Sequence, residues 1–352
     1  MNASRLSLAV FEHGLPIPAA AVVNVYRART SFDYTPFQGM DLKLYQSFRP
    51  EFDALIAAGF DVEPYADRSA DVHLVQITRA KAETMGLIAK AVRLAKPGGL
   101  IIVDGSKTDG IESILKRLKG VFQTSEPIAK SHGKLFWFNV PENKPDAVIA
   151  WEAEAAATHG PEGFQTAPGM FSHGKIDPGS TLLVDHIKAI PGGRIADLGA
   201  GWGYLSHHAL KTTDISELHL FEAEKTALDA AEANITDPRA RFHWADVLSL
   251  GDKEFDAVIS NPPFHQSRAA DPALGKAFIA KAAEILTPTG QFLMVANRHL
   301  PYEKDLAVHF ARIETLAETH HFKVFHASRP TRNSRNPERI PLGSAGKRAS
   351  KD

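Results

Sequence analysis

The 352-residue chain contains no cysteine. Disulfides, thiolate zinc sites and cysteine nucleophiles are therefore excluded together, and the composition is compatible with a reducing compartment. No apolar run approaches the roughly 20 residues that a membrane-spanning helix needs. The opening segment is followed by Glu12, His13, Pro16 and Pro18, which argues against a signal peptide. We therefore expect a cytoplasmic protein without a membrane partner.

A large charge of either sign is missing as well. The chain has 40 Lys and Arg residues against 41 Asp and Glu, a formal net charge of −1. Attraction to nucleic acid must therefore come from local basic surface and not from the protein as a whole. The apolar fraction of 44% and the charged fraction of 23% are ordinary for a globular protein, and the length favours two domains.

Segments typical of strands and of helices alternate along the chain. Apolar strand-like segments lie at 20–26, 72–77, 100–103, 135–140, 194–198, 218–222, 241–246, 255–260, 291–296 and 322–326. Helical periodicity is found at 51–58, 81–94, 111–118, 181–190, 205–210, 227–235 and 273–286. Such alternation predicts an α/β fold with parallel or mostly parallel sheets that are covered on both faces.

The two halves of the chain look related. A helix, the turn at 97–99 and the strand at 100–103 match a helix, the turn at 288–290 and the strand at 292–295. Under this match, residues 76–79 of the first half are equivalent in position to residues 261–264 of the second. The first half has no counterpart of the glycine-rich stretch at 199–203. The alternative is that any two α/β units look alike at this level. The stretch at 141–145 contains two prolines and is typical of a linker. We therefore expect domains at 1–145 and 146–328, followed by a basic tail at 329–352.

The stretch Asn261-Pro262-Pro263-Phe264 directly follows a strand-like segment. Neither proline can donate a backbone N–H, and each biases the residue before it toward extended geometry. Two carbonyls and an amide are thus left beside an aromatic ring at the carboxyl end of a strand, where open α/β sheets bind ligands. This arrangement suits a planar ligand that carries an amino group, although a rigid loop without chemistry would have the same sequence pattern.

The second motif joins a strand to a helix through Asp197-Leu198-Gly199-Ala200-Gly201-Trp202-Gly203. Glycines allow a ligand to approach the backbone closely. The spacing is not that of a dinucleotide site, and the preceding Asp197 suits an ammonium group better than a pyrophosphate. Glu222, at the end of the next strand, can take both hydroxyls of a ribose, and Asp246 can accept from an adenine amine. Ammonium, ribose and adenine together describe S-adenosylmethionine, although each acid alone could be a helix cap or a surface charge.

With these motifs, residues 164–327 resemble the catalytic domain of class I S-adenosylmethionine-dependent methyltransferases, and more narrowly the ribosomal RNA small subunit methyltransferase C family with its large-subunit relative. The resemblance rests on the two motifs and on the phrases at 169–172, 177–180, 295–302 and 322–325. It implies two tandem Rossmann-like class I methyltransferase domains, the N-terminal one degenerate. Because the first half lacks the glycine-rich stretch, we expect it to serve RNA docking and folding of the whole. It also implies methylation of the exocyclic N2 of a guanine in ribosomal RNA, with that RNA or the small ribosomal subunit as partner.

The resemblance implies a mechanism for the Asn261 motif. Hydrogen bonds from the guanine amine to the Asn261 side-chain oxygen and the Pro262 carbonyl would aim the nitrogen lone pair at the methyl group, and Phe264 would stack on the base. We expect Asn261 to border the cofactor together with Asp197, Gly199, Gly201, Glu222 and Asp246. No general base is evident. The histidine pairs at 207–208 and 320–321 lack clustered carboxylates, so no metal is expected.

Three other functions stay open. The substrate could be 23S instead of 16S ribosomal RNA. Amino methyltransferases that act on DNA adenine or on protein glutamine also use Asn-Pro-Pro-aromatic, commonly with tyrosine in the fourth place, where this chain has Phe264. A non-catalytic RNA-binding factor for ribosome assembly is the third; the intact Asp197, Gly199, Gly201 and Asn261 count against it. Oligomeric state cannot be inferred from the sequence.

The last 24 residues predict an electrostatic arm or a solubilising extension. Basic residues outnumber acidic ones there, with Arg332, Arg335, Arg339, Lys347, Arg348 and Lys351 against Glu338 and Asp352. If the segment binds RNA, truncation after Ser328 should weaken RNA binding. The slope of log K against log salt should also flatten by roughly 0.7 to 0.9 for each phosphate that the protein no longer neutralises, with cofactor affinity unchanged. Filter binding across a salt series measures this, and equal slopes would favour the solubilising extension.

Overall fold

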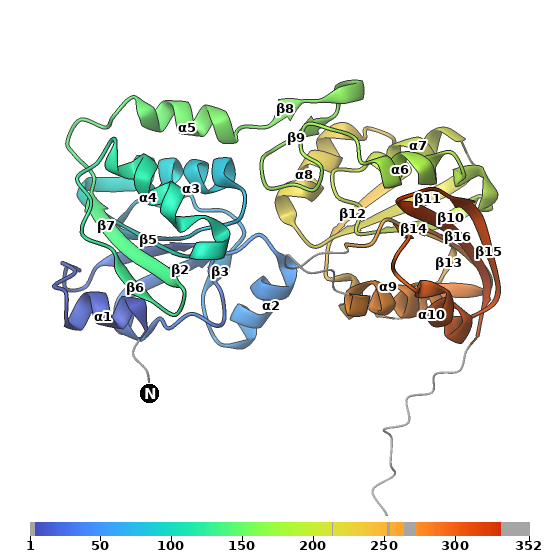
Figure 1. Cartoon of the computed structure of the whole chain (residues 1–352), viewed down its shortest axis with the longest axis horizontal. Coiled ribbons are helices and arrows are strands. Elements are labelled where there is room, and N and C mark those ends of the chain that lie inside the picture. The colour runs from blue at the N-terminus through green and yellow to red at the C-terminus, as the bar shows by residue number, and fades with distance from the viewer. Residues whose placement is uncertain (1–3, 213, 252–253, 264–271, 332–352) are drawn as a thin grey trace, which may run out of the picture.

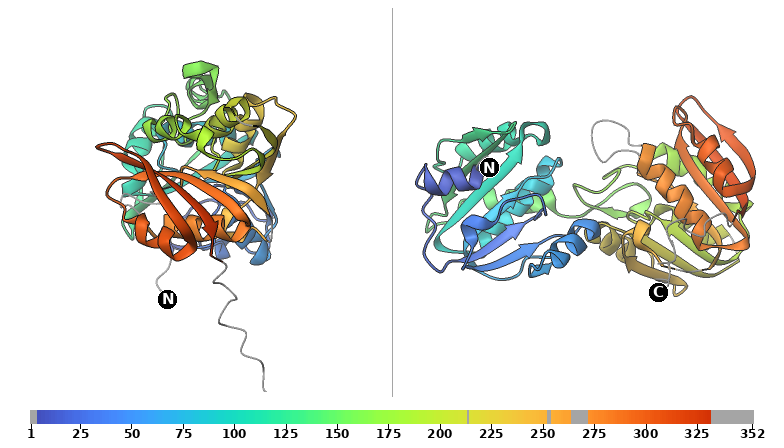
Figure 2. Two further views of the ribbon diagram at one scale, coloured as in Figure 1. Left: turned by 90° about the vertical axis from the view of Figure 1, so that its right-hand side faces the viewer. Right: turned by 90° about the horizontal axis from the view of Figure 1, so that it is seen from below.

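The computed structural model describes residues 4–212, 214–251, 254–263 and 272–331. The two halves of the chain form two lobes that lie side by side (Figures 1 and 2). Within these residues no helix is both long and apolar enough to cross a membrane.

The first lobe is built around one seven-stranded sheet in the order β3-β2-β1-β4-β5-β7-β6. Strands β1 to β5 run parallel, β7 is antiparallel to β5, and β6 is antiparallel to β7. The strands are β1 (Val22–Tyr26), β2 (Asp41–Tyr45), β3 (Val62–Glu63), β4 (Ala70–Gln76), β5 (Ala95–Ser106), β6 (Ile128–Lys130) and β7 (Gly133–Asn139), and the helices are α1 (Arg5–Phe11), α2 (Arg49–Ala57), α3 (Lys81–Leu94), α4 (Ile111–Lys119) and α5 (Ala147–Ala155).

The second lobe repeats that sheet in the order β12-β11-β10-β13-β14-β16-β15, with β16 antiparallel to both β14 and β15. A short hairpin of β8 (Thr158–His159) and β9 (Gln165–Thr166) precedes it. The strands are β10 (Gly193–Leu198), β11 (Ile215–Glu222), β12 (Ala240–Trp244), β13 (Phe255–Ser260), β14 (Leu286–Asn297), β15 (Phe310–Glu318) and β16 (Phe322–Pro330), and the helices are α6 (Pro178–Val184), α7 (Tyr204–Thr212), α8 (Lys225–Asn234), α9 (Pro272–Ile285) and α10 (Tyr302–His309).

The identical strand order confirms the predicted pair of Rossmann-like domains. Each lobe also has a register irregularity at the same place in the sheet, after Ala70 where β4 meets β5 and after Phe255 where β13 meets β14. In both cases the opposing strand skips the same number of residues. Counting onward from this shared landmark places Gln76 at the position of Asn261, as the duplicated sequence pattern predicts.

Both faces of the second sheet are covered, as its apolar strands predict. On neighbouring positions of β10, Ile195 belongs to one buried cluster and Ala196 to another, and on β13 Ile259 and Val258 divide in the same way. Side chains on successive residues of a strand point to opposite faces. The clusters therefore lie on opposite sides of the sheet and hold its two central strands in place.

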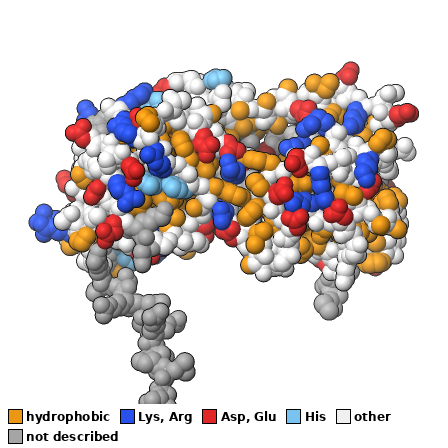
Figure 3. Space-filling model, turned by 180° about the vertical axis from the view of Figure 1, so that it is seen from behind, with side chains coloured by type: hydrophobic (Ala, Val, Ile, Leu, Met, Phe, Trp, Pro, Cys, Tyr) orange, Lys and Arg blue, Asp and Glu red, His pale blue; other side chains and the backbone are white. Residues whose placement is uncertain are grey.

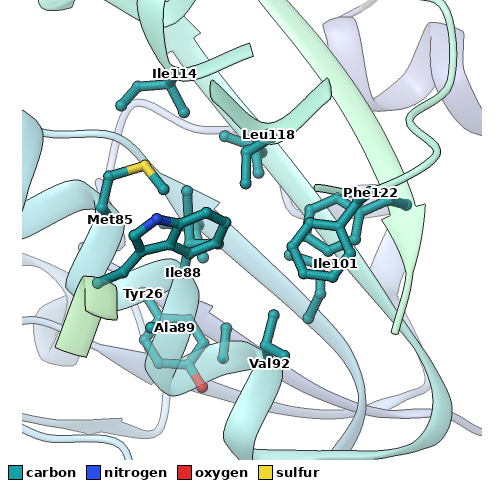
Figure 4. Close-up of a cluster of buried hydrophobic side chains, with 14 of the residues drawn as sticks. Tyr26, Met85, Ile88, Ala89, Val92, Ile101, Ile114, Leu118 and Phe122 are labelled. Carbon is teal, nitrogen blue, oxygen red and sulfur yellow. The ribbon is translucent and has the colours of Figure 1, made fainter. Parts of the chain in front are cut away.

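The core of the first lobe shows why α5 belongs with it. Apolar residues at helical spacing on α3 and α4 pack onto β1 and β5 (Figure 4): Met85, Ile88, Ala89, Val92, Ile114, Leu118, Ile101 and Tyr26. Trp151 of α5 is buried in the same cluster, and a Cβ on Gly86 of α3 would lie 2.2 Å from the Cβ of Ala155. The helix begins just past the predicted boundary at residue 145, yet it packs against the first half.

The first residues of the predicted tail, 329–331, are part of the folded second lobe. Strand β16 continues to Pro330, and the backbone N–H of Thr331 donates to the carbonyl of His309 at 2.8 Å. Residues 332–352 lie outside the described part of the chain. A truncation designed to remove only the tail should therefore follow Thr331, since a cut after Ser328 also removes the end of a strand.

The two lobes meet where equivalent strands end. After β2 and β11, Arg49 donates its backbone N–H to the carbonyl of Ala223, and Lys225 donates to Ser47, both at 2.8 Å. The residues between them form an isolated antiparallel bridge. The registers of β1 with β2 and of β10 with β11 make Ser47 the equivalent of Ala223 and Arg49 that of Lys225. The two bonds are thus related by a local two-fold axis, as in an isologous dimer interface.

Candidate functional site

A glycine loop leads from β10 into α7. Gly199, Gly201 and Gly203 have φ values of +73°, +56° and +92°, a region that residues with a Cβ rarely adopt. A Cβ built on Gly201 would meet nothing within 4 Å, so the described chain leaves the space above it open. The loop therefore has the shape that a closely approaching ligand requires, as its sequence predicts.

The loop and the Asn261 motif form one pocket, although about sixty residues separate them in the sequence. Parallel strands β10 and β13 are neighbours, and both motifs follow their carboxyl ends. The Ser260 hydroxyl donates to the carbonyl of Leu198 at 2.7 Å and holds the two strand ends together. The pocket is lined by Phe171, Asp177, Ser180, Gly199, Ala200, Gly201, Trp202, Tyr204, Leu205 and Asn261.

Asn261 is held by its amide nitrogen. Nδ2 donates to Asp177 Oδ2 at 3.0 Å and to Ser180 Oγ at 2.8 Å. Asp177 is itself fixed as the N-cap of α6, where Oδ2 accepts the backbone N–H of Ser180 at 2.8 Å. Because both amide protons are engaged, an incoming amine can bind the Asn261 side chain only at Oδ1. Pro262 is buried beside it, and Phe264 lies outside the described residues.

Glu222 closes the far side of the glycine loop. Its Oε2 accepts the backbone N–H of Gly201 at 2.7 Å, and its Oε1 accepts that of Glu224 at 2.8 Å. Burial raises the pKa of Glu222, and these hydrogen bonds oppose the rise. Each carboxylate oxygen can accept a further hydrogen bond. The fixed carboxylate beside Gly201 therefore suits the ribose hydroxyls that the sequence predicts for it.

Asp197 is fully buried and is not among the pocket-lining residues. Its Oδ2 accepts the Ser206 hydroxyl of α7 at 2.7 Å, whereas Oδ1 has no hydrogen-bond partner among the described residues. Burial raises the pKa of Asp197 from 3.8 to about 7. Keeping it ionised there costs about 4 kcal/mol more than in water. A cationic donor reaching Oδ1 would offset that cost, so the predicted ammonium contact is chemically consistent and stays a prediction.

Asp246 has a local role. It is the N-cap of the short helix Val247–Ser249, accepting the backbone N–H of Leu248 at Oδ1 (2.9 Å) and the Ser249 hydroxyl at Oδ2 (3.1 Å). The sequence leaves open that each of these acids is only a helix cap, and Asp246 does cap a helix. Its contact with an adenine amine stays a prediction.

Sequence reasoning missed the residues that hold the site from the other side. Asp177 and Ser180 are recognisable only as a helix start, because their contact with Asn261 spans more than eighty positions. Trp202 Nε1 donates to the carbonyl of Phe171 at 2.9 Å and ties the 169–172 turn to the glycine loop. The Phe171 side chain is 60% exposed. An exposed aromatic at a pocket wall can stack on a planar ligand.

Among the described residues, no group of three or more His, Asp or Glu side chains could hold a metal ion. His208 instead lies 3.3 Å from a carboxylate oxygen of Glu162, and its ring packs edge-on against Tyr204. The histidine pair at 320–321 lies in the turn before β16, where the backbone N–H of His321 donates to the Thr319 hydroxyl at 3.3 Å.

The equivalent positions of the first lobe carry different chemistry. The strand registers place Val25, Arg27, Gln46, Ala66 and Gln76 where the second lobe has Asp197, Gly199, Glu222, Asp246 and Asn261. Gln46 keeps part of the geometry, because its Oε1 accepts the Phe48 N–H at 2.9 Å as Glu222 accepts that of Glu224. Its Nε2, however, donates to the carbonyl of Ala28. The first lobe thus keeps the hydrogen bond to the backbone N–H two residues later, but Gln46 provides it with an amide in place of a carboxylate.

Known proteins resemble the chain over most of its length. The Methyltransferase small domain family matches residues 162–326. Relatives named ribosomal RNA small subunit methyltransferase C from Stutzerimonas stutzeri (strain A1501) and Pseudomonas aeruginosa (strain LESB58) are each 31% identical, over 66% of the chain and 72% of the relative for the first and 69% and 74% for the second. A solved structure of the T. thermophilus 16S rRNA N2 G1207 methyltransferase, in complex with AdoMet and guanosine, has a TM-score of 0.75 at 23% identity and covers 89% of both chains.

The buried Asp197 predicts a pH dependence of cofactor binding. An ammonium ligand favours the ionised carboxylate, so affinity should rise as pH increases toward the Asp197 pKa of about 7. Between pH 5.5 and pH 7 the expected gain is roughly tenfold, measured by calorimetry with S-adenosylmethionine. Asp197→Asn should bind more weakly and with little pH dependence over that range; a variant that keeps the full slope would assign the titration to another group.

Proposed function

The chain belongs to the ribosomal RNA small subunit methyltransferase C family, and we propose that it transfers a methyl group from S-adenosylmethionine to the exocyclic N2 amine of a guanine in 16S ribosomal RNA. The observation that carries this proposal is Asn261 held beside the glycine loop, with its oxygen reserved for an incoming donor. The T. thermophilus structure, which shares the fold, contains AdoMet and guanosine, the two ligand types that the pocket suits. A ribosomal RNA substrate supports a cytoplasmic location.

The chain's own contribution is mainly orientation. The bound cofactor would supply an electrophilic methyl group on its sulfonium. A guanine N2 is a poor nucleophile because its lone pair is conjugated with the ring. Accepting its two N–H groups at Asn261 Oδ1 and the Pro262 carbonyl would favour a pyramidal nitrogen whose lone pair faces the methyl group. Holding the two reacting atoms in line removes much of the entropic barrier, and the surplus proton leaves to water after transfer.

We assign the cofactor contacts to the residues that the sequence predicts. Gly199 and Gly201 give the cofactor close access to the backbone, and Glu222 accepts from the ribose hydroxyls. Asp197 offsets the ammonium charge from behind the loop, and Asp246 borders the adenine. The target guanine must be unpaired or extruded to reach Asn261, because pairing occupies one of its N2–H groups and stacked neighbours cover the lone pair of its N2.

We assign RNA docking and support of the fold to the first lobe. On the face shown in Figure 3, Lys and Arg side chains are interspersed with Asp and Glu over both lobes. Docking through a broad basic surface is therefore not favoured on this face. Contacts between the RNA and individual basic side chains, together with the tail, would supply the local charge that a chain of net charge −1 requires.

The hydrogen bonds of Asn261 with Asp177 and Ser180 predict how two substitutions change turnover. Asn261→Ala should lower turnover roughly 10²- to 10³-fold, the usual loss for a positioned polar group acting in the transition state, with cofactor affinity nearly unchanged. Ser180→Ala leaves the Asp177 contact in place and should lower turnover less. Single-turnover methylation of 16S ribosomal RNA with labelled cofactor measures both. Wild-type rates in Asn261→Ala would remove this residue from the mechanism.

The replaced positions of the first lobe predict one cofactor site per chain. Calorimetry of the whole chain with S-adenosylhomocysteine should give a stoichiometry near one. Gly201→Val should abolish it, because valine strains a residue with a φ of +56° and fills the open space. Two sites, or binding that survives Gly201→Val, would show that the first lobe retains cofactor binding.

A further inference from the structure

The position of Glu222 depends on its neighbour two residues later. The backbone N–H of Glu224 donates to Glu222 Oε1 at 2.8 Å, and the N–H of Gly201 donates to the other oxygen at 2.7 Å. Any shift of the chain at residue 224 would therefore move the carboxylate proposed to bind the ribose. The chain at 224 lies at the junction of the two lobes.

Residues of the first lobe hold the Glu224 side chain. Nη1 of Arg27 lies 3.0 Å from each carboxylate oxygen of Glu224, and the Ser47 hydroxyl donates to Oε1. The side chains of Arg27 and Glu224 are each 21% exposed. Ion pairs that are largely withdrawn from solvent are screened less than surface pairs. The contact can therefore fix the backbone at 224 more firmly than a surface ion pair would.

Arg27 has a second acidic neighbour, Glu83, which adjoins the segment that carries Phe171. Its Nε lies 3.8 Å from Glu83 Oε1, and the carboxylate of Glu83 lies so close to Gly169 that a Cβ there would be 2.5 Å from Oε2. Gly169 starts the turn that carries Phe171 into the pocket wall. One arginine thus lies between two acids, each of which adjoins a different segment of the cofactor site.

Arg27 stands where the second lobe has Gly199. The residue that opens a cofactor loop in one lobe is replaced, in the other, by a long side chain that crosses the junction. We propose that Arg27 is a positioning residue for the cofactor: with Ser47 it holds Glu224, and Glu224 holds Glu222 in place for the ribose hydroxyls. This inference rests on the proposed function, because it assigns the ribose to Glu222.

A double-mutant cycle on the whole protein tests the coupling. Arg27→Met removes the charge and keeps most of the volume, and Glu224→Gln keeps the backbone N–H and removes the ion pair. Each is measured for S-adenosylhomocysteine affinity by calorimetry in the wild-type and Glu222→Gln backgrounds. We expect roughly fivefold weaker binding in the wild-type background and less than a twofold change in the Glu222→Gln background, because residues of one network are non-additive. In turnover assays of Arg27→Met and Glu224→Gln, the KM for the cofactor should rise, while kcat at saturating cofactor should be unchanged.

Tyr65→Phe is the matched control. The Tyr65 hydroxyl donates to Asp229 of α8 across the same junction, and Asp229 in turn pairs with Lys225. Neither contact involves the carboxylate of Glu224 or of Glu222, so affinity should be unchanged. Equal decreases in both backgrounds, or the same decrease in Tyr65→Phe, would overturn the inference, since general loosening of the junction would then explain the effect. A wild-type protein that binds no S-adenosylhomocysteine would overturn the proposed function itself.

Discussion

The adjacency of β10 and β13 is the constraint on which the site depends. The sheet order reverses between these two strands, and open parallel sheets form their crevice at such a point. The Ser260 hydroxyl on the Leu198 carbonyl joins their ends. The glycine loop and Asn261 therefore face one space, although the two motifs are far apart in the sequence. Everything else in the pocket, from the α6 cap to the Phe171 turn, is arranged around this crevice.

The first lobe shows how little of that chemistry the fold itself requires. Its sheet has the same order, because the central strands of both lobes are buried and apolar. It also has the same irregularity after Ala70, where β4 meets β5. Arg27 and Gln46 stand at the positions of Gly199 and Glu222 in this crevice, and their side chains make contacts within the protein instead. Gln46 still accepts the N–H two residues later, which indicates that this hydrogen bond stabilises the strand end whether or not a ligand is present.

Sequence patterns predicted the buried part of the structure best. Helix α3 was predicted with the bounds that it has, since its apolar period faces the sheet. Strand β15 was missed because most of its side chains are at least partly exposed, so no alternation marks it. The hold of Asp177 on Asn261 could not be predicted, since it joins a helix cap to a strand end through tertiary packing. For Asp246 the local cap could be foreseen only as an alternative.

Asp177 also explains why an amide, and not an acid, follows β13. An aspartate at position 261 would place a second carboxylate about 3 Å from Asp177 Oδ2, where the amide nitrogen now lies at 3.0 Å, and like charges at that distance are strongly unfavourable. The Asn261 amide replaces that repulsion with a donated hydrogen bond, while its oxygen keeps the acceptor character of a carboxylate. A glutamine would push that oxygen one methylene further along the crevice, away from the Pro262 carbonyl that shares its task. Neutrality and polarity at position 261 are thus set by the acid that caps α6, and side-chain length by the Pro262 carbonyl.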